Sequence, residues 1–387
     1  MKRTIKNIMM VALATAAIGM VSCSKDENNG STSADTGKAS VIASNFVDKT
    51  VAPTYTNLAA KADELVQKLQ TLSASRTDAN VAAACEVFLD ARDWWEKSEA
   101  FLFGAATDFG IDPHIDSWPL DVDGFNNLMN SPAMLTSLAG DEGDVYAGDY
   151  LGNALLGFHG IEYILFANGQ PKAASAITNN QMTYAIAVAG DLRNRCFQLE
   201  VSWLGDDAPA AHIEKVEDLE LNCTLNGGYS YGENMKNAGR AGSSYVTAIA
   251  ALEAIVDGCR TIADEVGTSK IGQPYSGEDI NYIESPYSQK SVIDFYNNII
   301  SIQNVYFGGV QGQRDENNSL HSFVASFNSS LDAEVVAAIN NALLKIDAMP
   351  KPFVNNISDA RNGEAADACG ELDEVLGKLN AALRNLE

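Results

Sequence analysis

Residues 151–166, LGNALLGFHGIEYILF, are the most informative stretch of the sequence. At about 100° of rotation per residue, the large apolar side chains surround a helix on every side, which is typical of the protein interior. The helix nevertheless carries His159 and Glu162, which are three residues apart and therefore share one face. Gly157 and Gly160 lie roughly opposite that face, where they would let another backbone approach closely. We therefore expect a buried helix with one polar face.

Beyond residue 40, nearly the whole chain has the periodicity of amphipathic helices, and alternating strand patterns are almost absent. We expect helices at about 41–72 with a break near Pro53, 78–103, 124–130, 146–167, 175–203, 243–266, 289–307, 331–348 and 357–385. Segments rich in glycine, proline or polar residues predict irregular connections at about 104–124, 205–240, 267–288 and 309–318. The sequence therefore predicts an all-α protein.

The number and length of these helices indicate two antiparallel bundles, which would span residues 41–205 and 206–387. A similar sequence ends one helix in each half, and both copies precede an Asp-containing loop: Phe101-Leu102-Phe103-Gly104 and Val305-Tyr306-Phe307-Gly308. This similarity hints at a duplication. No shorter tandem period is present, which argues against a solenoid.

The N-terminus has the layout of a secretory signal over residues 1–22: a basic start, a short apolar core and small residues before Cys23. A cysteine at the cleavage point resembles a bacterial lipobox, so we expect lipid on Cys23 and a membrane anchor. Residues 23–40 are polar and predict a flexible tether. Lys25-Asp26-Glu27 resembles a surface-display signal of some Gram-negative lineages, and a plain acidic linker is the alternative.

The formal net charge of the chain is −25, and loss of the three basic residues within 1–22 would bring it near −28. Such a charge argues against nucleic acid as a partner and is compatible with gathering cations, although solubility alone explains much of it. Five cysteines follow Cys23, so they cannot all pair within the chain. Disulfides and buried thiols both remain open, and no cysteine or histidine cluster suggests zinc.

A buried carboxylate such as Glu162 requires a cation, a donor or a proton, because an unpaired buried charge is very costly. His159 and Glu162 have the i, i+3 spacing of carboxylate metal sites in helical bundles. One histidine among hard carboxylates favours iron, manganese or zinc over copper. The alternative is a hydrogen-bonded pair that fixes packing. The other histidines, His114, His212 and His321, lie in loops or near helix ends and are better read as solvated.

Three further segments carry candidate site residues. Glu99 is an acid on an apolar helical stripe, with Arg92 two turns before it, so an Arg92–Glu99 structural network is the alternative to a ligand role. Asp116 lies in the rigid loop Asp116-Ser117-Trp118-Pro119 that follows. Glu284 and Ser288 lie just before a predicted helix, and Ser288 is a plausible N-cap there. The usual zinc-protease, serine-hydrolase and phosphate-loop motifs are absent.

Together these segments resemble the imelysin family, whose members are also called imelysin peptidases. The family motif G-x-H-x-x-E is present as Gly157-Phe158-His159-Gly160-Ile161-Glu162. The segments Trp95–Phe101 and Ile115–Pro119 look like its earlier blocks, and Glu284–Ser288 with the helix to Gly309 looks like its later one. The four blocks occur in order, and the resemblance covers nearly all of residues 40–387.

This resemblance implies an all-α fold of two related antiparallel four-helix bundles packed together. It implies an exported lipoprotein of the outer membrane that faces the periplasm or the cell surface. Its expected ligand is iron; another metal such as zinc, or an iron-bearing partner in the envelope, are the alternatives. His159 and Glu162 would form the core of the site, with Glu99, Asp116 and Glu284 completing it. The alternatives are a metallopeptidase that uses His159 and Glu162, and an interaction module without metal.

Overall fold

The structure of the chain is a computed structural model that describes residues 31–387. Within this part the protein is all-α, as predicted, and its only strands are the short antiparallel pair β1 (Phe166–Ala167) and β2 (Gln170–Pro171). The predicted signal segment 1–22 and the lipidation residue Cys23 lie outside the described residues. The predicted tether 23–40 overlaps them in part, because the first helix already begins at Ser31.

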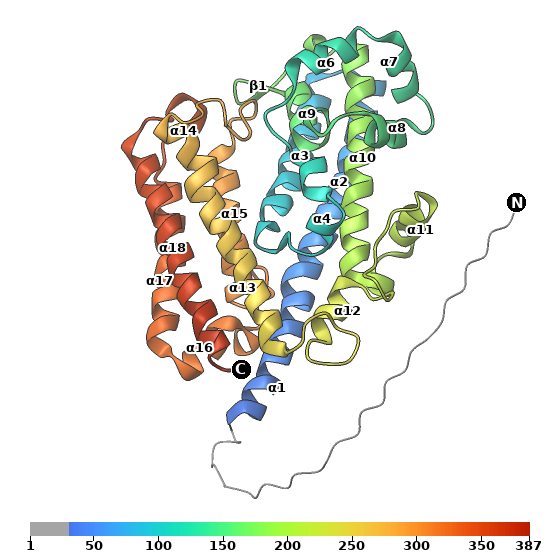
Figure 1. Cartoon of the computed structure of the whole chain (residues 1–387). Helices are drawn as coiled ribbons and strands as arrows, with labels where there is room; N and C mark the ends of the chain where they lie inside the picture. Colours follow the sequence, from blue (N-terminus) through green and yellow to red (C-terminus); the bar gives the residue numbers. More distant parts are fainter. Residues whose placement is uncertain (1–30) are drawn as a thin grey trace, which may run out of the picture.

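Figure 1 shows two groups of long helices side by side, with short helices at their ends. The helices of the first half are α1 (Ser31–Phe46), α2 (Ala52–Ala74), α3 (Asp78–Glu96), α4 (Ala105–Asp108), α5 (Ile111–Ile115), α6 (Val122–Met129), α7 (Pro132–Leu138), α8 (Gly143–Tyr150), α9 (Gly157–Leu165), α10 (Asn179–Leu204), α11 (Ala210–Asp218) and α12 (Tyr231–Lys236). Those of the second half are α13 (Ala248–Glu265), α14 (Gly272–Ser276), α15 (Ser291–Tyr306), α16 (Leu320–Phe327), α17 (Ser329–Asp347) and α18 (Ala360–Arg384).

The first helix group consists of α2, α3, α9 and α10, and the second of α13, α15, α17 and α18. The groups meet where α15 packs against α3, and one continuous apolar core extends through both. Helix α1 precedes the first group in sequence but packs against α13 of the second. The two groups therefore share an interior, and the polar cluster described below lies inside it.

Two π turns interrupt the helical period where the sequence suggested breaks. The first, Val47–Val51, leads directly into α2, whose first turn accommodates Pro53 because a proline there loses no intrahelical hydrogen bond. The second, Val266–Ile271, joins α13 to α14, so residues 267–276 are helical rather than irregular. A π turn inserts residues into the helical repeat, so the apolar stripe changes face and the pattern looks irregular.

The predicted continuous helix 146–167 is wrong, because the chain leaves the helical conformation after α8 and re-enters it at Gly157. Gly157 has φ of +65°, and a Cβ there would lie 1.8 Å from the backbone oxygen of Ile115. The expected close backbone approach therefore occurs, and it occurs beside the segment that carries Asp116. The predicted helix 78–103 is also too long, since α3 ends at Glu96 and a separate 3₁₀ turn, Glu99–Phe101, follows.

Two further features were left open by the sequence. The five cysteines after Cys23 are all unpaired in the described structure, and four of them are buried, so the buried-thiol alternative is the one observed. Among the residues from 31 onward, no helix is both long and apolar enough to cross a membrane.

Replacing Gly157 by alanine should destabilise the protein by about 2–4 kcal/mol, because the new Cβ would be strained at positive φ and would strike the backbone of Ile115. Gly370 in the middle of α18 is the matched control, since nothing lies within 4 Å of its would-be Cβ. Gly370→Ala should stabilise by up to about 1 kcal/mol. Urea unfolding of both variants measures the difference, and equal stabilities would contradict this account of Gly157.

Candidate metal site between the two helix groups

The polar residues singled out in the sequence converge at the junction of the two helix groups. We call the following set the buried ionic cluster, since each member is at most 7% exposed: Arg92, Glu96, Glu99, Asp116, His159, Glu162, Lys270, Glu284 and Asp294. The first group of helices and its loops supply six of these residues, and the second group supplies the last three. The cluster therefore depends on the two groups being packed together.

His159 lies between two carboxylates. Its Nε2 is 3.1 Å from Oδ1 of Asp116, and its Nδ1 is 3.3 Å from Oε2 of Glu162. Burial acts to lower the pKa of His159, but the contacts with Asp116 and Glu162 outweigh it and raise the pKa to about 9. The predicted His159–Glu162 face is thus confirmed, and the two carboxylates favour the protonated imidazole.

Glu162 joins the two helix groups through backbone donors. Its Oε1 accepts hydrogen bonds from the N–H groups of Tyr287 (3.1 Å) and Ser288 (2.7 Å), in the loop before α15. The predicted N-cap role of Ser288 is wrong, because α15 begins at Ser291 with Lys290 in the cap position. Ser288 instead contributes its backbone N–H to the cluster, and its hydroxyl is buried without a hydrogen-bond partner in the described structure.

Arg92 lies at the centre of the cluster. Its guanidinium pairs with Asp116, and its Nη2 is 2.5 Å from carboxylate oxygens of both Glu96 and Glu284. Arg92 and Glu99 are not directly paired, but Glu284 and Lys270 link them within the cluster. Because α3 ends at Glu96, the next turn carries Glu99 away from the face of Arg92, and Glu96 takes the i, i+4 position instead.

Lys270 is the second buried cation of the cluster, and sequence reasoning missed it. Its Nζ lies 3.3 Å from Glu284, 3.7 Å from Glu99 and 3.8 Å from Glu96, and 5.4 Å from the ring centre of Trp118. The only available signal was a lysine between Val266 and Ile271, and the sequence predicts an irregular connection from residue 267 onward. Glu96 and Asp294 were also missed, although Glu96 follows Arg92 by one helical turn.

The cluster contains more acids than bases. Six buried carboxyl groups face three positive groups: Arg92, Lys270 and protonated His159. Desolvation raises the pKa of Glu96 and of Glu99 well above the ordinary value, and raises that of Asp294 to about 7. The surplus carboxyl groups must therefore hold protons or share a further cation.

Two overlapping sets of side chains have ligand atoms within 4.8 Å of one another, as a metal ion requires: Asp116, His159 and Glu284; and Glu96, Glu99 and Asp116. Asp116 belongs to both. Burial acts to raise its pKa, but Arg92 and His159 hold the pKa well below its usual range. Glu284 also has one carboxylate oxygen without a hydrogen-bond partner in the described structure. The two sets thus contain four of the five predicted ligands, and the fifth, Glu162, contacts His159.

A cavity of about 230 Å³ reaches the cluster, and it is lined by Glu99, Asp112, Pro113, Asp116, Ser117, Trp118, Glu265, Lys270 and Tyr282. Burial, together with the nearby Asp116 and Glu265, raises the pKa of Asp112 to about 7. A second cavity of about 560 Å³ shares Glu99, Asp112 and Glu265 with the first. The cluster is therefore approached through acid-lined space.

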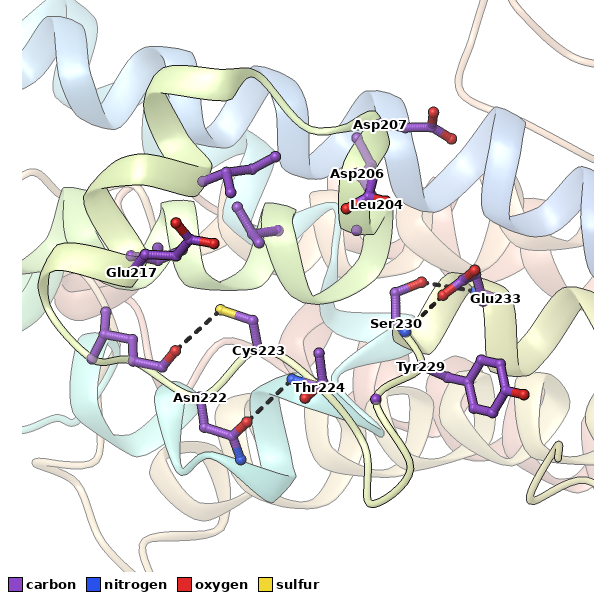
Figure 2. A pocket seen from close by; sticks show the side chains of 16 residues that line it. Leu204, Asp206, Asp207, Glu217, Asn222, Cys223, Thr224, Tyr229, Ser230 and Glu233 are labelled. Carbon is purple, nitrogen blue, oxygen red and sulfur yellow. Dashed lines mark hydrogen bonds between the residues drawn. The ribbon is translucent and has the colours of Figure 1, made fainter.

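A larger cavity of about 680 Å³ lies elsewhere, between the end of α10, helix α11 and the loop leading to α12 (Figure 2). Its lining includes Cys223, Tyr229 and several acids but no predicted site residue. The histidines outside the motif belong to neither set of potential metal ligands. They are partly exposed, and each also pairs with a carboxylate: His114 with Asp191, His212 with Glu200 and His321 with Asp332.

These features define a class: helical proteins that enclose one histidine among buried carboxylates. Within that class, the sequence profile of the Imelysin family matches residues 51–379, and the chain belongs to this family. The predicted family resemblance is thus confirmed.

Three relatives place the chain within the family. Iron-regulated protein A of Synechococcus elongatus is 29% identical over 320 residues, which are 82% of this chain and 77% of the relative. The crystal structure of a putative iron-regulated protein A precursor from Parabacteroides distasonis is 28% identical, with a TM-score of 0.75 over 89% of this chain and 95% of that one. An imelysin-like protein from Psychrobacter arcticum is 14% identical, with a TM-score of 0.63 over 88% and 93%, and shares the fold.

The raised pKa of His159 predicts a pH-dependent stability of the metal-free protein. The folded state holds this proton up to about pH 9, whereas the unfolded chain releases it near 6.5. This proton therefore adds to the free energy of unfolding. Its contribution, on the order of 3 kcal/mol, is complete below pH 6.5 and is lost as the pH rises through 9. Unfolding of protein treated with a chelator, measured between pH 6 and 9, should show this loss. His159→Gln should flatten the profile, and identical profiles would contradict the assignment.

Proposed function

We propose that this protein captures a metal cation at the buried ionic cluster, with Asp116, His159 and Glu284 as its first ligands. The observation that carries the proposal is the surplus of buried carboxyl groups around a histidine, which a cation of charge two or three would neutralise. Arg92 pairs with both Asp116 and Glu284, so the incoming ion must displace the guanidinium from at least one of them.

Iron is the cation that the donor set favours. Several carboxylates with a single imidazole form a hard site, which suits iron better than copper and also admits manganese or zinc. Two relatives have names that refer to regulation by iron, in agreement with this choice. Binding would remove the proton from His159, because only the neutral imidazole donates an electron pair to a metal.

We further propose that the protein acts in iron uptake as a lipoprotein of the cell envelope. The signal segment and Cys23 support export and anchoring, and the acidic body would hold a cation, or an iron-bearing partner, near the membrane. Glu162 does not have the surroundings of a protease general base, because it already accepts two backbone hydrogen bonds and contacts His159.

Metal titration tests the capture proposal. Wild-type protein should bind Fe²⁺ or Fe³⁺ with release of about one proton at pH 7, measured by calorimetry in buffers of different ionisation enthalpy. His159→Ala and Glu284→Gln should each weaken binding at least tenfold. His321→Ala is the matched control, since it removes a carboxylate-paired histidine far from the cluster and should leave affinity unchanged.

If the wild type and the His159→Ala and Glu284→Gln variants bind iron equally well, the metal binds outside this cluster. A wild-type protein that binds none of the iron, manganese or zinc ions, and whose thermal stability none of them changes, would instead favour a purely structural ionic network. That outcome would leave the protein as an interaction module.

The anchor has a separate test. In Gram-negative cells grown with radiolabelled palmitate, the wild-type protein should incorporate the label and fractionate with the outer membrane. Cys23→Ala should lose the label and appear in the soluble fraction. Retention of label by this variant would rule out Cys23 as the lipidation site.

A further inference from the structure

Lys270 occupies an unusual position for a lysine. Its side chain is 1% exposed and extends from the π turn Val266–Ile271, a distortion that is frequent at functional sites. Its ammonium lies within 4 Å of carboxylates from three separate segments, those of Glu96, Glu99 and Glu284. The ammonium therefore contacts two members of one set of potential metal ligands, Glu96 and Glu99, and one member of the other, Glu284.

Each set of potential metal ligands is therefore already held by a cation of the chain. Arg92 pairs with Glu96, Asp116 and Glu284, whereas Lys270 pairs with Glu96, Glu99 and Glu284. The two cations differ in access. Lys270 lines the cavity of about 230 Å³, whereas Arg92 does not. Lys270 therefore borders open space into which its ammonium can move.

The same cavity offers the ammonium a second set of acidic partners. Asp112 and Glu265 line it together with Lys270, and neither belongs to the two ligand sets. A lysine side chain has four rotatable carbon–carbon bonds, so its ammonium can exchange one group of carboxylates for another while the backbone of the π turn stays in place.

We propose that Lys270 is a specificity-determining residue, whose ammonium fills the cation position in the metal-free protein and moves into the cavity when a metal ion enters. This inference rests on the proposed function. An entering ion must outcompete a charge of one that is already bound, and Coulomb energy in a buried site grows with the charge of the ion. The lysine therefore excludes monovalent ions and weakly bound divalent ions in favour of more highly charged ones.

Selectivity measurements test this role directly. Lys270→Met removes one of the two buried cations of the cluster that hold these acids, so its affinity for Ca²⁺ and Mg²⁺ should rise at least tenfold, whereas its affinity for Ga³⁺, supplied as citrate complex, should change much less. Lys270→Arg keeps the charge and should retain the selectivity of the wild type. An unchanged ratio of Ga³⁺ to Ca²⁺ affinity in Lys270→Met would overturn the proposal.

A second experiment uses the unmodified protein, so its outcome does not depend on the folding of a variant. Acetic anhydride labelling followed by mass spectrometry should modify Lys270 several-fold faster when Ga³⁺ is bound, because its ammonium has left the carboxylates. Lys172 is the internal control. Its ammonium is half-buried and donates a hydrogen bond to the backbone oxygen of Tyr163, which belongs to neither set of potential metal ligands, so its labelling should not change.

The two hypotheses fail in different ways. If Ga³⁺ binds to the wild type and the labelling rate of Lys270 stays the same, the specificity-determining role of Lys270 is wrong. The proposed metal capture is then unaffected. If the wild type binds neither Ga³⁺ nor iron, both fail. Trp118 gives an independent signal, since the ammonium lies over its ring, and the fluorescence change on Ga³⁺ binding should disappear in Trp118→Phe.

Discussion

The burial of six carboxyl groups between two groups of helices is the constraint on which the rest of the structure depends. Taking charges out of water costs several kcal/mol each, so every acid must find a cation, a donor or a proton. Arg92, Lys270 and His159 supply positive charge, and the loop before α15 supplies two N–H groups to Glu162. Because these partners come from both helix groups, the cluster exists only when the groups are packed together.

The main features of the fold and the centre of the site could be predicted from sequence because they depend on local spacing. An apolar period of 3.6 residues predicts helices wherever they are long, and the i, i+3 spacing places His159 and Glu162 on one face. Asp116 and Glu284 could be named as candidates from their own segments, but only the family resemblance placed them in one site, since nothing local brings residues 116 and 284 together. The division at 205–240, the relation between the halves and the membrane anchor remain predictions.

The role of Lys270, the partners of Arg92 and the break at Gly157 could not be predicted from the sequence, for physical reasons. Lys270 lies on a π turn, where the helical phase shifts and the apolar pattern is lost. A continuous helix would place Arg92 and Glu99 on the same side. The end of α3 at Glu96 changes the direction of the chain instead. The break at Gly157 was missed because its cause is distant in sequence: the backbone of Ile115 occupies the space of a side chain.

The central claim is that a metal ion enters the cluster between Asp116, His159 and Glu284. Anomalous X-ray diffraction at the iron edge, from crystals grown with iron, tests it most directly. The account predicts an anomalous peak within coordination distance of these three side chains, with the guanidinium of Arg92 displaced from at least one carboxylate. Crystals of iron-saturated protein with no peak there, and with Arg92 still paired to Asp116 and Glu284, would contradict it.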